Sequence, residues 1–267
     1  MVNGGLADAE RIQRAIEEEE FARGHVEPGS PPVEPRPAAT ICVARTADSG
    51  FEVLLLRRPL ASRFAAGAHV FPGGTIDPED RSPAALERLV GGEISEPEAL
   101  FAALREAFEE TGFLLGAGGQ DPEAAERVLS GRDRLLAGET TFPELLAESE
   151  VELDASGAVY FTRWITPVQL DRRYDTRFFL ARHSGGEPRL TREHTDFRWL
   201  EPSVALELFG AGRLPMLFPT RKTLQLLSRF DRLEDVFTSF RKREVKPILA
   251  RIIVEDGRVV PVPFDYD

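Results

Sequence analysis

The segment from Arg105 to Phe113 constrains this chain more than any other. It reads Arg-Glu-Ala-Phe-Glu-Glu-Thr-Gly-Phe, so the carboxylates of Glu106, Glu109 and Glu110 fall at positions i, i+3 and i+4 of a helix and share one face. Apolar residues recur at helical spacing on the other side, which predicts an amphipathic helix with one buried face. These residues are Leu100, Ala103, Leu104, Ala107 and Phe108.

The two ends of this helix carry their own signals. Ser95, with Glu98 three residues later, predicts a capping box at the start. Gly112 predicts a C-terminal cap, because glycine readily adopts the left-handed conformation in which many helices end. The helix is therefore expected to run from about residue 95 to residue 112.

Three acids crowded on one face destabilise an isolated helix, and no lysine lies among them to offset the repulsion. One interpretation is a solvated acidic face. The other is a metal site, because the hard cations Mg²⁺ and Mn²⁺ prefer oxygen ligands and can activate water for attack on phosphorus. Arg105, four residues before Glu109, is placed to brace that carboxylate through a charged hydrogen bond.

Strand signals flank this helix on both sides. Apolar segments at 39–45 and 51–57, separated by a turn at 48–50, predict a hairpin. Strands mixed with helices but without regular alternation predict an α+β layered domain. Further strands are predicted at 159–165, 176–182, 197–200 and 252–254, and helices within 120–150 and at 203–210 and 220–230.

Composition narrows the class of protein. The net charge of -12 argues against nucleic acid as a partner. Cys42, the one cysteine of the sequence, excludes an internal disulfide and a multi-cysteine zinc site, and its apolar surroundings predict a buried, inert thiol. With no segment apolar enough to span a membrane and no signal peptide pattern, a cytoplasmic protein is expected.

The start of the chain differs from the rest. A polar helix is predicted from Ala7 to Arg23, although the like charges of Glu17 to Glu20 within it repel one another. Five prolines between residues 28 and 37 follow this helix. Residues 1–37 are therefore expected to form a flexible or loosely docked extension, and residues 38–267 the main domain.

Taken together with Phe71-Pro-Gly-Gly74, the acidic run resembles the Nudix box, G-x5-E-x7-R-E-U-x-E-E-x-G-U, where U is aliphatic. Gly74 and Arg105 are 31 positions apart, against 14 in the box, so about 17 residues are inserted. Counted back from Arg105, the middle glutamate of the box falls on Pro97. Either Glu96 or Glu98 substitutes for it, or its role is absent.

The resemblance extends to one branch of the family, the one that includes the peroxisomal coenzyme A diphosphatase of animals. Trp164–Pro167 and Arg173–Phe179 are similar to the downstream signature of that branch. This implies a Nudix-type α/β/α sandwich with a mixed central sheet, with insertions near 75–97 and 117–157. The insertions leave two roles open, a lid over the site or a contact in a homodimer.

The resemblance also implies a site. Arg57, Arg63 and Gly67 stand in register with a motif of coenzyme A cleaving Nudix enzymes, although Leu55, Arg58 and Pro59 depart from it. Arg57 and Arg63 are candidates to bind extra phosphate groups. The other interpretation is that they are exposed arginines without a ligand.

The metal is expected on Glu106, Glu109 and Glu110. Because Gly73 and Gly74 allow close backbone approach, the Gly73 carbonyl is a further candidate ligand. Glu193 is the candidate distal carboxylate, with a solvated loop acid as its alternative. His69, Trp164 and Trp199 are better explained by packing.

Three functions remain open. The first is hydrolysis of coenzyme A or its thioesters to 3',5'-ADP and a phosphopantetheine product, dependent on Mg²⁺ or Mn²⁺. The second is hydrolysis of another nucleoside diphosphate derivative, such as ADP-ribose, NADH or a nucleotide sugar. The third is a nucleotide-binding regulatory module without turnover, against which the intact set of acids argues.

Overall fold

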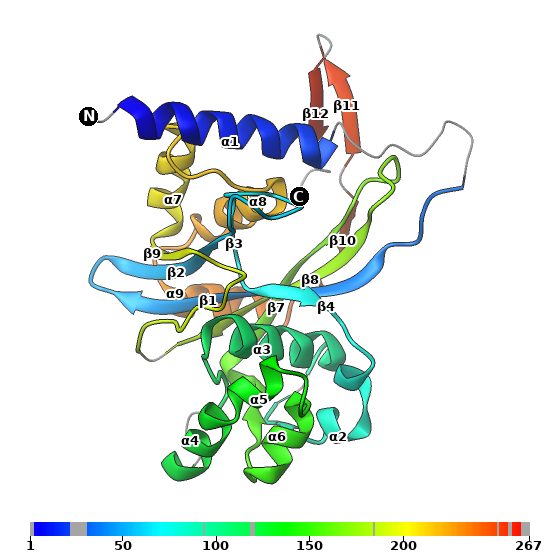
Figure 1. Ribbon diagram of the computed structural model, residues 1–267, viewed down its shortest axis with the longest axis vertical. Helices are drawn as coiled ribbons and strands as arrows, with labels where there is room; N and C mark the ends of the chain where they lie inside the picture. The colour runs from blue at the N-terminus through cyan, green and yellow to red at the C-terminus, as the bar shows by residue number, and fades with distance from the viewer. Residues whose placement is uncertain are drawn as a thin grey trace.

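The hairpin predicted near the start of the sequence lies at the centre of a mixed sheet (Figure 1). The computed structural model describes residues 3–21, 31–92, 94–117, 121–183, 185–249, 251–255 and 258–262. Its strands are β1 (Arg36–Ala47), β2 (Gly50–Arg57), β3 (His69–Val70), β4 (Gly73–Thr75), β5 (Leu89–Val90), β6 (Leu153–Asp154), β7 (Ala158–Ile165), β8 (Tyr174–Arg182), β9 (Asp196–Leu200), β10 (Pro247–Leu249), β11 (Arg251–Glu255) and β12 (Arg258–Val262).

The main sheet has eight strands. Six of them follow the path β10-β7-β8-β1-β2-β3, while β4 pairs with β1 and β9 pairs with β2. Strand β1 runs parallel to β8 and antiparallel to β2, so the sheet is mixed, as predicted. The other edge of β1 is shared, because its first half pairs with β4 and its second half with β2. This pairing carries the glycine turn into the middle of the sheet. Strands β5 and β6, and β11 and β12, form two small separate sheets.

Helices cover both faces of the main sheet. They are α1 (Asn3–Phe21), α2 (Pro83–Leu86), α3 (Pro97–Thr111), α4 (Pro122–Ser130), α5 (Arg132–Leu136), α6 (Phe142–Glu148), α7 (Pro202–Gly210), α8 (Phe218–Leu227) and α9 (Leu233–Phe240). Two 3₁₀ turns are also present: η1 (Glu79–Arg81) lies between β4 and α2, and η2 (Ala155–Gly157) between β6 and β7. Helix α3 lies directly against one face, with the inserted helices α4 to α6 beyond it, and α1 lies on the far side of the molecule near α7 and α8 (Figure 1).

Alternation along β1 divides the core in two. Ile41 and Val43 face α3 and the inserted helices, whereas Cys42 and Ala44 face α8 and α9. This follows from the period of two in a strand, which sends successive side chains to opposite faces. Cys42 is fully buried, and burial raises the pKa of its thiol well above the usual range, as expected for an inert cysteine.

The predicted strands and helices are present, whereas α2, α9 and the short strands β3 to β6, β10 and β12 were missed. The capping box at Ser95 is wrong, because α3 begins at Pro97 and its N-cap is Glu96 in a left-handed conformation without a side-chain cap. The carboxylate of Glu96 accepts a hydrogen bond from Arg177 instead. The predicted cap at Gly112 is confirmed, since it is left-handed and its N–H donates to the carbonyl of Phe108.

Among the described helices, none combines the length and the apolar character that crossing a membrane would need.

Candidate active site

Arg105 is buried at the centre of the site, and each part of its guanidinium has a partner. Its Nε and Nη2 donate to the two carboxylate oxygens of Asp80 at 2.8 and 2.9 Å. Nη2 also donates to the carbonyl of Thr75 at 3.0 Å, and Nη1 reaches the carboxylates of Glu106 and Glu109 at 3.0 and 3.3 Å. Arg105 thus joins the acidic helix to the loop that follows the glycine turn.

Asp80 is fully buried and was missed by the sequence analysis. It also accepts a hydrogen bond from the backbone N–H of Asp77 at 2.8 Å, so both of its oxygens are occupied. Counted forward from Gly74 rather than back from Arg105, it stands at the position of the middle glutamate of the box. The insertion therefore lies between Asp80 and Arg105.

The two glutamates considered for that role have other partners. Glu96 bonds to Arg177, and Glu98 lies 3.7 Å from Arg81 in an exposed ion pair. Neither substitutes for the middle glutamate, because the position is already occupied by Asp80.

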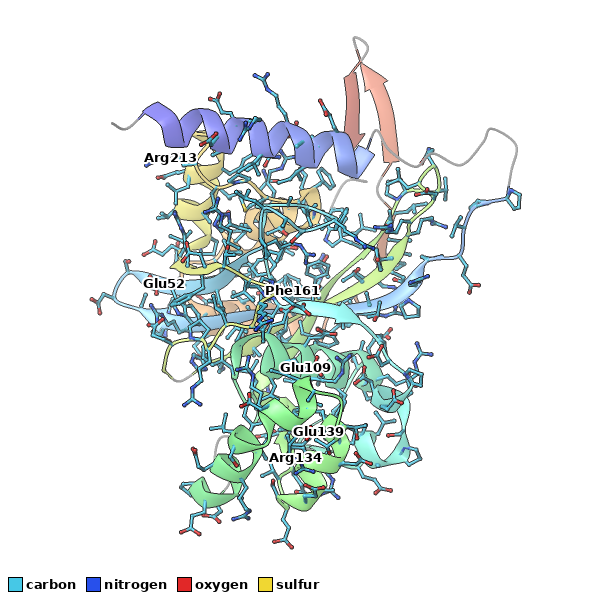
Figure 2. All side chains as sticks on the ribbon, in the orientation of Figure 1. Glu52, Glu109, Arg134, Glu139, Phe161 and Arg213 are labelled. Carbon is cyan, nitrogen blue, oxygen red and sulfur yellow. The ribbon has the colours of Figure 1, made fainter. Side chains whose placement is uncertain are left out.

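The glycine turn and the acidic helix face each other. The N–H of Gly73 donates to the carboxylate of Glu110 at 3.3 Å. A side chain at Gly74 would overlap the carboxylate of Glu106, so any larger residue there would displace that acid from its present position. In Figure 2, Glu109 lies on α3 between the sheet and the inserted helix that carries Arg134. The fold thus brings together the acids and glycines that the sequence singled out.

Burial raises the pKa values of all three acids, and neighbouring carboxylates add to each shift. Burial, with the charge of Glu109 adding to it and Arg105 opposing it, raises the pKa of Glu106 to about 7. The pKa of Glu109 is raised mainly by burial. Burial and the charges of Glu106 and Glu193 raise the pKa of Glu110 well above its usual range. A nearby positive charge would relieve this cost.

For Arg105 the balance is reversed. Burial alone would lower the pKa of the guanidinium, but the hydrogen bonds that it donates to Asp80 and the charges of the surrounding acids outweigh this effect. The net shift is upward, so Arg105 is held as a permanent cation inside the site.

A cavity of about 640 Å³ opens beside these groups. Its polar lining includes Gly73, Gly74 and Glu110, together with the charged residues Arg58, Arg63, Asp171 and Arg172. Its other walls are largely apolar or aromatic. They include Phe64, Trp164, Ile165, Pro167, Leu170, Phe178, Leu217 and Phe218.

The candidate residues outside the box, Arg57, Arg63 and Glu193, differ in their position relative to the cavity. Arg63 is exposed and lines the cavity, whereas Arg57 is not among the described lining residues and its neighbour Arg58 is. Glu193 is exposed at the rim, close enough for its charge to act on Glu110. No motif pointed to His194, which is buried with its Nε2 4.0 Å from a carboxylate oxygen of Glu110. Burial lowers the pKa of His194 to about 4, so the imidazole is neutral.

The carboxylates suit a hard divalent cation in chemistry, since they are crowded oxygen donors whose burial calls for a compensating charge. Within the described part of the chain, no three acidic, histidine or cysteine side chains already converge on one point. Glu106 and Glu109 are turned toward Arg105 instead, so a cation there would require rotation of these side chains.

A glycine turn set against a helix of buried glutamates, on a mixed sheet between helical layers, defines a Nudix hydrolase, and the chain belongs to this family of enzymes. It is 31% identical to a Nudix hydrolase from Alicyclobacillus acidocaldarius, with 78% of this chain and 97% of that one covered and a TM-score of 0.63. The family profile described as the NUDT19 Nudix domain matches residues 98–224.

Curated relatives point to the same branch. The chain is 28% identical to the human acyl-coenzyme A diphosphatase NUDT19, over 90% of this chain and 75% of that protein. It is 25% identical to the acyl-coenzyme A diphosphatase NUDT19 of Xenopus laevis, over 81% of this chain and 71% of the relative.

Proposed function

We propose that this enzyme hydrolyses the diphosphate linkage of coenzyme A or acyl-coenzyme A to 3',5'-ADP and (acyl-)phosphopantetheine. The observation that carries the proposal is one continuous cavity lined by the acid Glu110 and the glycine turn, by three arginines and by many apolar side chains. A substrate with a central diphosphate, a further phosphate and a long, weakly polar arm matches these three features in one molecule. The names of the curated relatives support the same substrate.

The acids of α3 provide the reactive end. Glu106, Glu109 and Glu110 would hold Mg²⁺ or Mn²⁺, with the carbonyl of Gly73 and the rim carboxylate of Glu193 as further candidate ligands. A bound cation would screen the charge of the diphosphate and polarise its phosphoryl oxygens. Arg105 orients Glu106 and Glu109 through its Nη1 hydrogen bonds. One of the three carboxylates is the candidate to accept the proton of the attacking water.

The arginines provide recognition. A guanidinium makes paired hydrogen bonds to phosphate oxygens, and Arg63 lines the cavity. Arg58 takes the place proposed for Arg57, because it is the one of these two neighbours that lines the cavity. Arg58 and Arg63 are therefore the proposed contacts of the 3'-phosphate.

The test is an assay of purified protein with Mg²⁺ or Mn²⁺ against coenzyme A, an acyl-coenzyme A, dephospho-coenzyme A, ADP-ribose and NADH, with products identified by mass. Faster turnover of coenzyme A than of dephospho-coenzyme A supports the proposal. Preference for ADP-ribose or NADH would replace it with a different nucleotide substrate. Binding without turnover of any compound would indicate a regulatory module.

A further inference from the structure

Helix α1 is tied to the body of the protein through the side chain of Gln13. The backbone N–H of Met216 donates to Gln13 Oε1 at 2.9 Å, and Gln13 Nε2 donates to the carbonyl of Met216 at 3.4 Å. Gln13 Nε2 also donates to Glu17 at 2.9 Å, one turn further along α1, which orients the amide. One side chain thus occupies both backbone groups of Met216.

A second contact lies one turn away. Ile16 is only 1% exposed and forms a small core cluster with Ala65 and Ala68, against which Phe64 and Leu217 pack. These contacts span two chain segments, 60–68 and 214–218. Helix α1 therefore contacts both segments at once.

The loop is shaped to receive the helix. Gly67 has a φ of +76°, and a side chain there would press against Ile12 of α1 and against Leu60. The backbone of the loop can approach α1 this closely only because the position is a glycine. The two segments that α1 contacts are also held together by a β-bridge between His69, which directly follows the first segment, and Met216 of the second.

Both segments that α1 contacts form walls of the cavity. Arg63 and Phe64 come from the first, and Leu217 and Phe218 from the second. Helix α1 itself contributes none of the described lining residues. The acids of α3 have separate partners, because Glu106 and Glu109 accept hydrogen bonds from Arg105 and Glu110 accepts one from the N–H of Gly73. The contacts of α1 thus bear on the binding walls and leave the acids untouched.

We propose that α1 is a positioning element for substrate binding, in which Gln13 and Ile16 hold the two cavity walls in their binding geometry. They act through Arg63, Phe64, Leu217 and Phe218 and do not touch the reacting atoms. The inference rests on the proposed function only in taking this cavity as the substrate site.

The test compares Gln13→Ala and Ile16→Ala with the control Arg14→Ala, an exposed position on the same helix. Gln13→Ala removes two hydrogen bonds to Met216 without opening a core cavity, so it is the variant least expected to affect folding. Hydrogen exchange followed by mass spectrometry should show faster exchange in peptides covering 60–68 and 214–220. Peptides from α3 should exchange as in the wild type, and the control should match the wild type throughout.

Kinetics with coenzyme A provide the second measurement. In Gln13→Ala, KM should rise roughly 3- to 10-fold, the range expected for net loss of one or two hydrogen bonds, while kcat changes by less than about 2-fold. Unchanged exchange in both segments, or a loss confined to kcat, would overturn the proposal. If the wild type does not turn over coenzyme A, the proposed function fails, and the exchange measurement still decides the role of α1.

Discussion

Asp80 and Arg105, 25 residues apart in the sequence, form a buried two-pronged ion pair with distances of 2.8 and 2.9 Å. The pair joins η1, just after the glycine turn, to the helix that carries the acids. Since the remaining donors of Arg105 reach Glu106, Glu109 and Thr75, the geometry of the whole site depends on this one contact.

Removing Asp80 should therefore destabilise the protein strongly. Asp80→Ala leaves a buried guanidinium short of its main partner, and breaking one side of a buried pair costs about 3–5 kcal/mol. Denaturation in urea measures the loss. The exposed pair of Arg81 and Glu98 serves as control, because Arg81→Ala should cost less than about 1 kcal/mol. Equal losses in the two variants would show that the buried pair has no special role.

Asp80 is also an example of a site residue that could not be predicted from local sequence signals. Local signals predicted what depends on neighbours in the chain, such as the strand at 39–45 and the cap at Gly112. The partner of Arg105 lies across an insertion of unpredicted length, so counting back from the arginine pointed to Pro97. Counting forward from Gly74 would have found it.

The predicted cap at Ser95 failed for a related reason. Glu96 is drawn to Arg177, which is 81 residues away, and this long-range contact displaces the local preference for a capping box. The same limit applies to Arg58 and His194, whose approach to Glu110 is set by tertiary packing and not by a motif. What the sequence located was the set of acids and glycines that the fold brings together.

Glu109→Gln should lower kcat roughly 100-fold or more, because a neutral amide is a poor metal ligand and cannot accept a proton. The side chains are similar in size, so the fold should persist. Titration with Mn²⁺ should show weaker binding in parallel. Glu98→Gln, on the exposed side of the same helix, is the control and should retain both rate and affinity. An unchanged rate in Glu109→Gln would remove this residue from the mechanism.

Arg132 links the inserted helices to the end of the catalytic helix. Its guanidinium donates to the carbonyls of Phe108 and Glu109 at 2.9 and 2.7 Å, and to that of Arg189 at 2.8 Å. Positive charge and hydrogen bonds at a helix C-terminus stabilise the carbonyls left without partners.

Arg132→Ala should cost roughly 1.5–3 kcal/mol of unfolding free energy, the range for hydrogen bonds made by charged groups. Arg134 is on the same short helix and pairs with Glu148 in solvent, so Arg134→Ala should cost less than about 1 kcal/mol. Guanidinium denaturation of both variants provides the measurement. If Arg132→Ala proves no worse than Arg134→Ala, the inserted helices do not anchor α3 through this residue.

His69 should make the stability of the protein depend on pH. It is buried beside the cavity, where its Nδ1 lies 3.3 Å from the carbonyl of Pro215. Burial, assisted by the charges of Arg198 and Arg57, lowers the pKa of His69 from 6.5 to about 4. The native state therefore holds a neutral imidazole in a range of pH where the unfolded chain binds a proton.

The sign follows from linkage. Stabilisation by the neutral His69 is complete above pH 6.5 and is lost as pH falls toward 4, because only the unfolded state gains the proton. The loss is on the order of 2 to 3 kcal/mol at pH 4. His69→Asn, whose amide nitrogen can replace Nδ1, should flatten urea unfolding free energies measured between pH 7 and pH 4. Part of the slope should remain, since burial lowers the pKa of His194 in the same direction. A variant with the full wild-type slope would show that His69 is protonated in the native state.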